Sequence, residues 1–218
     1  GVAAVVVLTA LGDGARRYVL DQFLAIGSNV VIVLPGRSQT GGFSPANAIT
    51  STTRDLSIED AQALLRARGV KRVTPVVVGL SEVNVGGRLR EATVVGTTAE
   101  YGQMRQLALS QGRFLTEGDW TRGAPEVVLG ATLRRELFGA EPAIGRTVRI
   151  GDRRFRVTGV LASRGLGLGV NADEVAFVPV SAALSMFKTG TLFRVLIEAD
   201  SRSAVPAVKS EVARIIAL

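Results

Sequence analysis

Acid–base chemistry in this chain would have to rest on carboxylates, because the sequence contains no histidine and no cysteine. The absence of both residue types excludes Ser-His and Cys-His nucleophile systems and histidine-based zinc sites. The candidate acids are Asp119, Asp173 and Glu174. Asp119 fits a turn and the adjacent pair fits the start of a strand, so structural roles are favoured over proton transfer. We therefore predict no catalytic residue, no metal site and no cofactor-binding site.

Alternating glycines in the segment SRGLGLGVNA, residues 163–172, raise the question of a phosphate-binding loop. A P-loop needs a Lys-Ser or Lys-Thr pair and a helix after the glycines, and this segment has neither. We interpret the segment as a flexible linker or hinge. The sequence therefore predicts no nucleotide-binding loop in this segment.

The composition is that of a folded protein with an aliphatic core, since 47% of the 218 residues are hydrophobic and 5% are aromatic. The formal net charge is +7. The densest basic groups, residues 134–135 and 149–156, lie on helix and strand patterns, which is typical of a solvated face. Aromatic residues for base stacking are sparse and unclustered, so no nucleic-acid partner is expected.

The opening stretch of the chain contains an apolar segment, a helical segment and a strand. Residues 1–11 are apolar and uncharged but fall short of the ~20 residues that span a bilayer. We interpret residues 1–12 as the end of a truncated membrane helix; a secretory signal or a buried element of a soluble domain are the alternatives. Residues 13–26 predict a stalk helix with Val19 and Phe23 on its apolar face, and residues 30–34 predict a core strand.

The rest of the chain alternates between helix and strand patterns. Residues 37–54 form a long polar loop that contains Phe43. Ser57 and Asp60 predict a capped helix start, and glycines at 86–87 and 151 predict hairpin turns. Further strands are expected at 73–85, 89–95, 126–129, 147–150, 155–161, 174–178 and 192–199, and a turn at 111–114. Helices are expected at 98–106, at 131–138, at 181–186 with Ser181 as its cap, and from 203 onward. The last helix has Val208 and Val212 on its apolar face.

This order of elements predicts an α+β fold with an insertion. Residues 13–96 and 173–218 form one layer of helices and strands, and residues 97–172 form a second, mostly β unit inserted in it. The last helix becomes more apolar toward residue 218, so both ends of the chain are expected to lead to membrane helices.

A set of short motifs, in order along nearly the whole chain, resembles the MacB family of permeases. Each motif is weak alone, and the ordered set is specific. The motifs are LGDGARR (11–17), LAIGSN with VVIVLPG (24–36), GTT with Tyr101 (96–101), GRF with Asp119 (112–119), VVLG (127–130), LFG (137–139), IG (144–145), FRVTGVL (155–161) and VP (178–179).

The resemblance implies the periplasmic core domain of a MacB/FtsX-type ABC transporter permease in a bacterial inner membrane. It implies a porter-like α/β subdomain next to stalk helices, at 13–96 and 173–218, and an inserted sabre-like subdomain at 97–172. The function implied is mechanotransmission, in which ATP-driven movement across the membrane drives export or efflux from the periplasm. Partners implied are an ABC ATPase domain or subunit, a second permease copy in a homodimer, and a periplasmic adaptor with an outer-membrane channel.

Candidate contact and coupling residues follow from this reading. Phe43 in the polar loop, with Arg113, Phe114 and Trp120 in the inserted unit, are candidates for partner or substrate contact, although core packing is favoured for Phe114 and Trp120. Val19, Phe23, Val208 and Val212 are the stalk positions expected to couple movement. The alternative function is a membrane-anchored extracytoplasmic binding domain with no ATPase partner.

Overall fold

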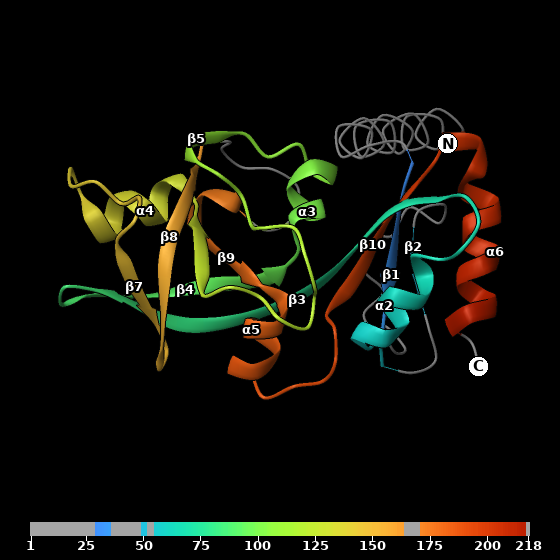
Figure 1. Ribbon diagram of the computed structural model, residues 1–218, viewed down its shortest axis with the longest axis horizontal. Coiled ribbons are helices and arrows are strands. Elements are labelled where there is room, and N and C mark those ends of the chain that lie inside the picture. The colour runs from blue at the N-terminus through green and yellow to red at the C-terminus, as the bar shows by residue number, and fades with distance from the viewer. Residues whose placement is uncertain (1–28, 36–48, 52–54, 164–170, 217–218) are drawn as a thin grey trace, which may run out of the picture.

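The computed structural model of the chain describes residues 29–35, 49–51, 55–163 and 171–216 (Figure 1). The described elements are β1 (Val30–Leu34), β2 (Ile49–Ser51), α2 (Ile58–Leu64), β3 (Val70–Val85), β4 (Arg88–Thr97), α3 (Ala99–Met104), β5 (Leu109–Gly112), β6 (Glu126–Leu129), α4 (Ala131–Phe138), β7 (Thr147–Ile150), β8 (Arg153–Leu161), β9 (Val175–Pro179), α5 (Val180–Met186), β10 (Arg194–Ala199) and α6 (Val205–Ile216). Short 3₁₀ turns precede β9 and α6.

Strand β3 is 16 residues long and takes part in two regions of one sheet. Its first half pairs with β10, from Val70 opposite Ala199 to Val76 opposite Arg194. Strands β1 and β2 continue this region beyond β10, and together the four strands form what we call the end sheet. The second half of β3 pairs with β4 along its other edge, so β3 carries the chain from one region into the other.

The second region closes on itself. From β3 the hydrogen-bonded neighbours run through β4, β9, β6 and β8 to β7, and β7 pairs back onto β3 at Val83 and Asn84. We call these six strands the barrel. Closure of this kind removes free sheet edges, which are otherwise templates for unwanted pairing. Figure 1 shows the barrel and the end sheet at opposite ends of the long axis, joined by β3 and by the chain that leads from α5 into β10.

Local sequence explains most of the element boundaries. Helix α2 begins at a full capping box, in which the Ser57 hydroxyl accepts from the Asp60 amide and the Asp60 carboxylate accepts from the Ser57 amide. The β3–β4 hairpin turns at Gly86 and Gly87, both at positive φ, as a type I′ turn requires. Both predicted features are confirmed, and so is the α+β fold class.

Three local predictions are wrong. Residues 111–114 were expected to be only a turn, but Leu109–Gly112 form β5, which pairs with β8. All four residues of β5 are exposed, so the strand carries no hydrophobic alternation to reveal it. Ser181 does not cap α5: the helix starts after Pro179, and the Ser181 hydroxyl instead accepts from the Gly123 amide. Strand β3 also begins three residues before the predicted start at 73.

The hydrophobic core lies on both faces of the sheet. The larger cluster runs from the α6 side of the end sheet into the barrel, and the smaller one lies around Phe177 and Val76. Hydrogen bonding runs continuously from one region to the other and does not by itself define subdomains. The predicted subdomain boundaries at residues 97 and 172 therefore stay a prediction.

The predicted membrane segment, residues 1–12, lies outside the described residues, as do Val19, Phe23 and Phe43. Within the described part of the chain, no helix is both long enough and apolar enough to cross a bilayer.

Close approach of α5 to β4 depends on Gly96. A Cβ added at Gly96 would collide with Cβ of Ala183 in α5, so the helix would have to move away from the sheet. We expect Gly96→Ala to lower the free energy of unfolding by about 1–3 kcal/mol, the usual effect of overpacking a core. Urea unfolding of the purified chain measures this.

Gly190→Ala is the matched control, because a Cβ there has no neighbour within 4 Å and the backbone is not at positive φ. We expect its unfolding midpoint to stay within experimental error or to rise slightly. Equal destabilisation by both substitutions would contradict the close-approach argument.

Candidate interaction site

Helix α6 is anchored to the end sheet by a single apolar face. Val208, Val212 and Ile216 are spaced by four residues and are fully buried. The helix packs against α2 and β1, and Figure 1 shows it along the outer side of the end sheet. The predicted coupling positions Val208 and Val212 are therefore core residues, which bind the helix firmly to the sheet.

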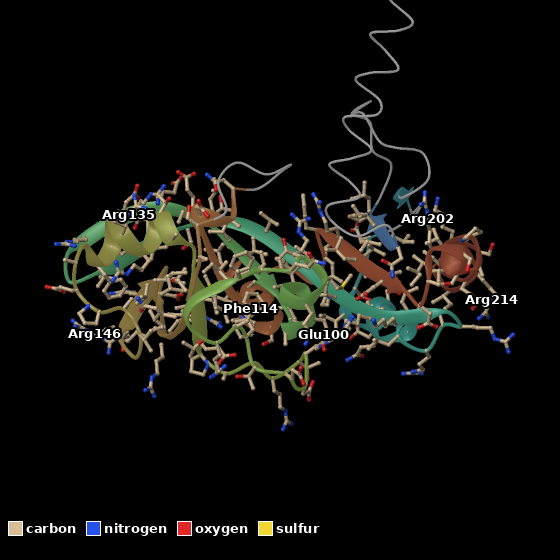
Figure 2. The ribbon with its side chains drawn as sticks, turned by 90° about the horizontal axis from the view of Figure 1, so that it is seen from above. Glu100, Phe114, Arg135, Arg146, Arg202 and Arg214 are labelled. Atoms are coloured by element: carbon tan, nitrogen blue, oxygen red, sulfur yellow. The ribbon has the colours of Figure 1, made fainter. Side chains whose placement is uncertain are left out.

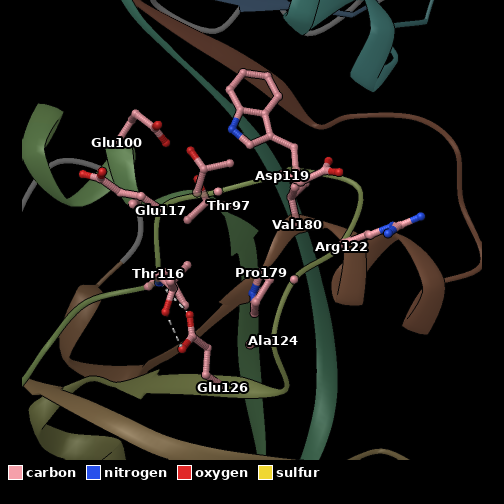
Figure 3. A pocket seen from close by; sticks show the side chains of 16 residues that line it. Thr97, Glu100, Thr116, Glu117, Asp119, Arg122, Ala124, Glu126, Pro179 and Val180 are labelled. Carbon is pink, nitrogen blue, oxygen red and sulfur yellow. Dashed lines mark hydrogen bonds between the residues drawn. The ribbon is translucent and has the colours of Figure 1, made fainter.

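The segment between β5 and β6 surrounds an open hollow of about 560 Å³ that includes solvent-filled space (Figure 3). Trp120 lines this hollow and is half-buried against the larger core cluster. Figure 3 shows Glu100 and Glu117 on one side of the hollow and Asp119 and Arg122 on the other. The predicted packing role of Trp120 and its place at an accessible hollow are both consistent with this position.

Arg113 is held by a buried carboxylate from β6. Its guanidinium Nη2 donates to Oε2 of Glu126 at 2.9 Å, and the Glu126 side chain is only 5% exposed. The Thr116 amide and hydroxyl also donate to Glu126, at 2.6 Å and 3.0 Å. Charged hydrogen bonds of this kind fix the loop after β5 onto the barrel. Arg113 itself remains 56% exposed, so it stays accessible to a partner.

Phe114 packs inside the molecule. Its ring meets Phe177 of β9 edge-on, with ring centroids 5.6 Å apart, and Tyr101 approaches the same ring at 5.7 Å. Such tilted aromatic pairs contribute about 0.5–1.5 kcal/mol beyond the area they bury. Phe114 is therefore a packing residue of the smaller core cluster.

The three candidate acids have structural partners: Asp119 and Asp173 accept hydrogen bonds, and Glu174 forms an ion pair. The Thr121 hydroxyl and amide donate to Asp119, and these bonds lower the pKa of that carboxyl. Asp173 is buried and accepts from the Ser163 hydroxyl at 2.9 Å. Glu174 lies 3.6 Å from the Arg90 guanidinium. A general acid at neutral pH needs a raised pKa, and Asp119 has the opposite shift.

The described ranges contain no cluster of metal ligands. No group of three or more Asp or Glu side chains there is placed to hold a metal ion.

Comparison with known proteins identifies the family. The family model of the MacB-like periplasmic core domain matches residues 1–215. The chain belongs to this family. The resemblance drawn from the sequence motifs is thereby confirmed.

Relatives of this MacB-like domain are much longer proteins. The chain is 30% identical over 214 residues to the macrolide export ATP-binding/permease protein MacB of Wolinella succinogenes, covering 97% of the chain and 32% of that protein. It is 32% identical over 207 residues to the pyoverdine export ATP-binding/permease protein PvdT of Pseudomonas aeruginosa, covering 94% and 30%. The chain thus spans about a third of the relatives' length.

Solved structures share the fold of this MacB-like domain. The periplasmic region of MacB from Actinobacillus actinomycetemcomitans aligns with a TM-score of 0.72 at 22% identity, covering 91% of this chain and 89% of that one. The extracellular domain of the transporter YknZ from Gram-positive bacteria aligns with a TM-score of 0.68, also at 22% identity, covering 86% and 92%. At this identity the likeness concerns the fold.

Sequence reasoning missed Glu126 in this MacB-like domain. The residue opens β6, whose other three residues are apolar, and all four are buried. A lone carboxylate in an apolar strand signals a buried ion pair, because an unpaired buried charge is costly. The partner could not be identified from the sequence, since Arg113 lies in a loop with no regular spacing to β6.

We expect Glu126→Ala to lower the free energy of unfolding by about 1–3 kcal/mol, because the Thr116 amide and the Arg113 guanidinium lose their acceptor. Glu117→Ala is the control, since Glu117 is exposed and makes only a long, 3.5 Å contact with Gln103. Thermal unfolding of both variants measures the difference. A stability loss no larger for Glu126→Ala than for the control would show that the pair is not structural.

Proposed function

We propose that this domain is the periplasmic part of an ABC transporter permease that transmits ATP-driven movement across the inner membrane to drive export or efflux from the periplasm. The observation that carries the proposal is the family match over residues 1–215. Relatives named as ATP-binding/permease proteins extend well beyond the matched third of their length, so there is room in them for an ATPase.

A mechanical route from the chain's C-terminal helix to the barrel supports this proposal. Helix α6 is fixed to the end sheet by Val208, Val212 and Ile216. Burial of each such side chain contributes about 1.5–3 kcal/mol, so a displacement of α6 carries the end sheet with it. Strand β3 then links the end sheet to the barrel without a break. A force applied at α6 would thus move the barrel.

The partners follow from the same proposal. An ABC ATPase domain or subunit supplies the movement, and a second permease copy completes a homodimer. A periplasmic adaptor and an outer-membrane channel take the substrate onward. The domain itself is proposed to be non-catalytic, to hold no cofactor and to lie on the periplasmic side of the inner membrane, as the family description supports. A membrane-anchored binding domain without an ATPase is the alternative.

Affinity purification of the intact, tagged protein from crosslinked membranes tests the first partner. We expect an ABC ATPase to be recovered, either within the same chain or as a separate subunit, because the relatives are named as ATP-binding/permease proteins. Mass spectrometry identifies it. Recovery of no ATPase would favour the binding-domain alternative.

Ala213→Pro in the intact transporter tests the coupling role of α6. Ala213 is exposed in the second half of the helix, three residues before its end at Ile216, so the substitution removes no buried side chain. Proline in a helix interior costs about 3 kcal/mol and bends the helix. We expect ATP hydrolysis in membranes to persist and export to fall severalfold, scored as resistance of cells to a panel of macrolides and peptides.

Ala213→Gln is the matched control, since glutamine is a good helix former at a solvent position. It should leave both ATP hydrolysis and export unchanged. Normal export by the proline variant at normal protein level would contradict mechanical coupling through α6.

A further inference from the structure

The outer face of the β7–β8 hairpin carries a row of arginines that form no ion pair with any residue that the structure describes. Along this hairpin Val148, Ile150, Phe155 and Val157 point inward and are buried, while the alternate positions are exposed. Arg149 and Arg154 lie directly opposite each other in the ladder, and Arg156 follows two residues on. Like charges in such cross-strand pairs are destabilising.

Two shallow hollows extend this row across the neighbouring segment. One hollow, of about 810 Å³ including open solvent, is lined by Arg113, Arg156 and Ile144 among others. The other, of about 750 Å³, is lined by Arg122, Arg153 and Arg154. Both include Ala124 and Pro125, so they adjoin each other at one short stretch of backbone. The two adjoining hollows are together called the arginine groove.

The charge of the arginine groove is strongly one-sided. Its only lining carboxylate is Glu126, which Arg113 already pairs. Within the described residues, Arg122, Arg153, Arg154 and Arg156 have no carboxylate within 4.0 Å, although Arg122 is close enough to lower the pKa of Asp119. Arg153 donates to the Ser185 hydroxyl of α5, which fixes that side chain in place. Four guanidinium groups of the groove therefore have no carboxylate partner among the described residues.

We propose that the arginine groove binds an extended acidic segment of a partner protein. Arg154 and Arg156 project from one face of a strand, so their spacing is about 7 Å. Carboxylates at alternate positions of an extended peptide have the same spacing. A guanidinium pairs with a carboxylate through two parallel hydrogen bonds, which a point-charge cation cannot do. Ile144, 41% exposed at the rim, offers an apolar contact beside the charges.

A protein partner fits the position of the groove better than a lipid surface. Figure 2 places Arg146, next to the β7–β8 hairpin, at the end of the molecule opposite Arg214 of α6. This step rests on the proposed function: if the described ends at β1 and α6 lead toward the membrane, the arginine groove faces away from it. An acidic protein in the periplasm could therefore contact the arginine groove on the side away from the membrane.

Fluorescence anisotropy with the intact permease in zwitterionic nanodiscs tests the proposal. The probe is a fluorescein-labelled peptide of four Glu-Thr repeats, and the four Gln-Thr repeat peptide is its uncharged counterpart. We expect the glutamate peptide to bind, with affinity falling as NaCl is raised, and the glutamine peptide not to bind. Arg154→Gln with Arg156→Gln should weaken binding at least about tenfold.

Arg135→Gln with Arg202→Gln is the matched control. Both residues are exposed, lie outside the groove and form no ion pair in the described structure, and the loss of charge is the same. This control should bind the glutamate peptide like the parent protein. An equal loss in both double variants would mean nonspecific attraction by net charge and would overturn the proposal.

Further measurements check that the variants fold and that the bound anion is a protein carboxylate rather than a lipid. Arg154→Lys with Arg156→Lys should keep only part of the affinity, since it retains charge and loses the paired hydrogen bonds. The glutamine double variant should unfold no earlier than the parent, because the repulsion between Arg149 and Arg154 is relieved. Phosphatidylglycerol vesicles and unlabelled glutamate peptide are compared as competitors over the same range of negative-charge concentrations. If the vesicles displace the labelled peptide at the lower concentration, the proposal is overturned in favour of a lipid. Because no ATP is needed, this outcome is independent of whether an ATPase is recovered.

Discussion

The hydrogen-bond ladder along β3 is the constraint on which the rest of the structure depends. The strand pairs with β10 over its first half, with β4 over its second half and with β7 at its far end. Val73, Val77 and Val83 face the larger core, and Val76 faces the smaller one. A one-residue slip would exchange these two faces, so the strand fixes the register of both sheet regions at once.

The local parts of this fold follow directly from the sequence. The capping box at Ser57, the glycine hairpin between β3 and β4 and the apolar face of α6 each need only a few neighbouring residues to specify them. The barrel could not be predicted in this way. It contains two parallel pairs, β4 with β9 and β6 with β8, and closes where β7 pairs with β3, and the partners in each pair are far apart in sequence. Such pairings depend on the whole chain, because the hydrophobic pattern of a strand does not identify the strand with which it pairs.

In the candidate site, too, the residue types could be recognised from the sequence, whereas their contacts with residues distant in sequence could not. Phe114 was recognisable as a packing residue by its type, but its contact with Phe177 depends on β9 returning beside the loop after β5. Arg113 was recognisable as a candidate contact, whereas the buried Glu126 that fixes it was not. For the arginines at 149–156, strand alternation correctly indicates a solvated face. Only the placement of the segment at 121–125 next to β8 turns that face into a groove.

The hairpin that carries these arginines shows how stability and recognition are separated. Repulsion between Arg149 and Arg154 costs a few tenths to about 1 kcal/mol. Each of the four buried side chains on the inner face contributes about 1.5–3 kcal/mol by its burial, so the inner face decides whether the hairpin forms. The residue types on the outer face are therefore not constrained by the stability of the hairpin. The same logic holds at the other end of the molecule, where the buried face of α6 attaches it to the end sheet and leaves its exposed face free. The two ends are connected through β3, so the arginine groove and the strands that α6 packs on belong to one continuous hydrogen-bonded sheet.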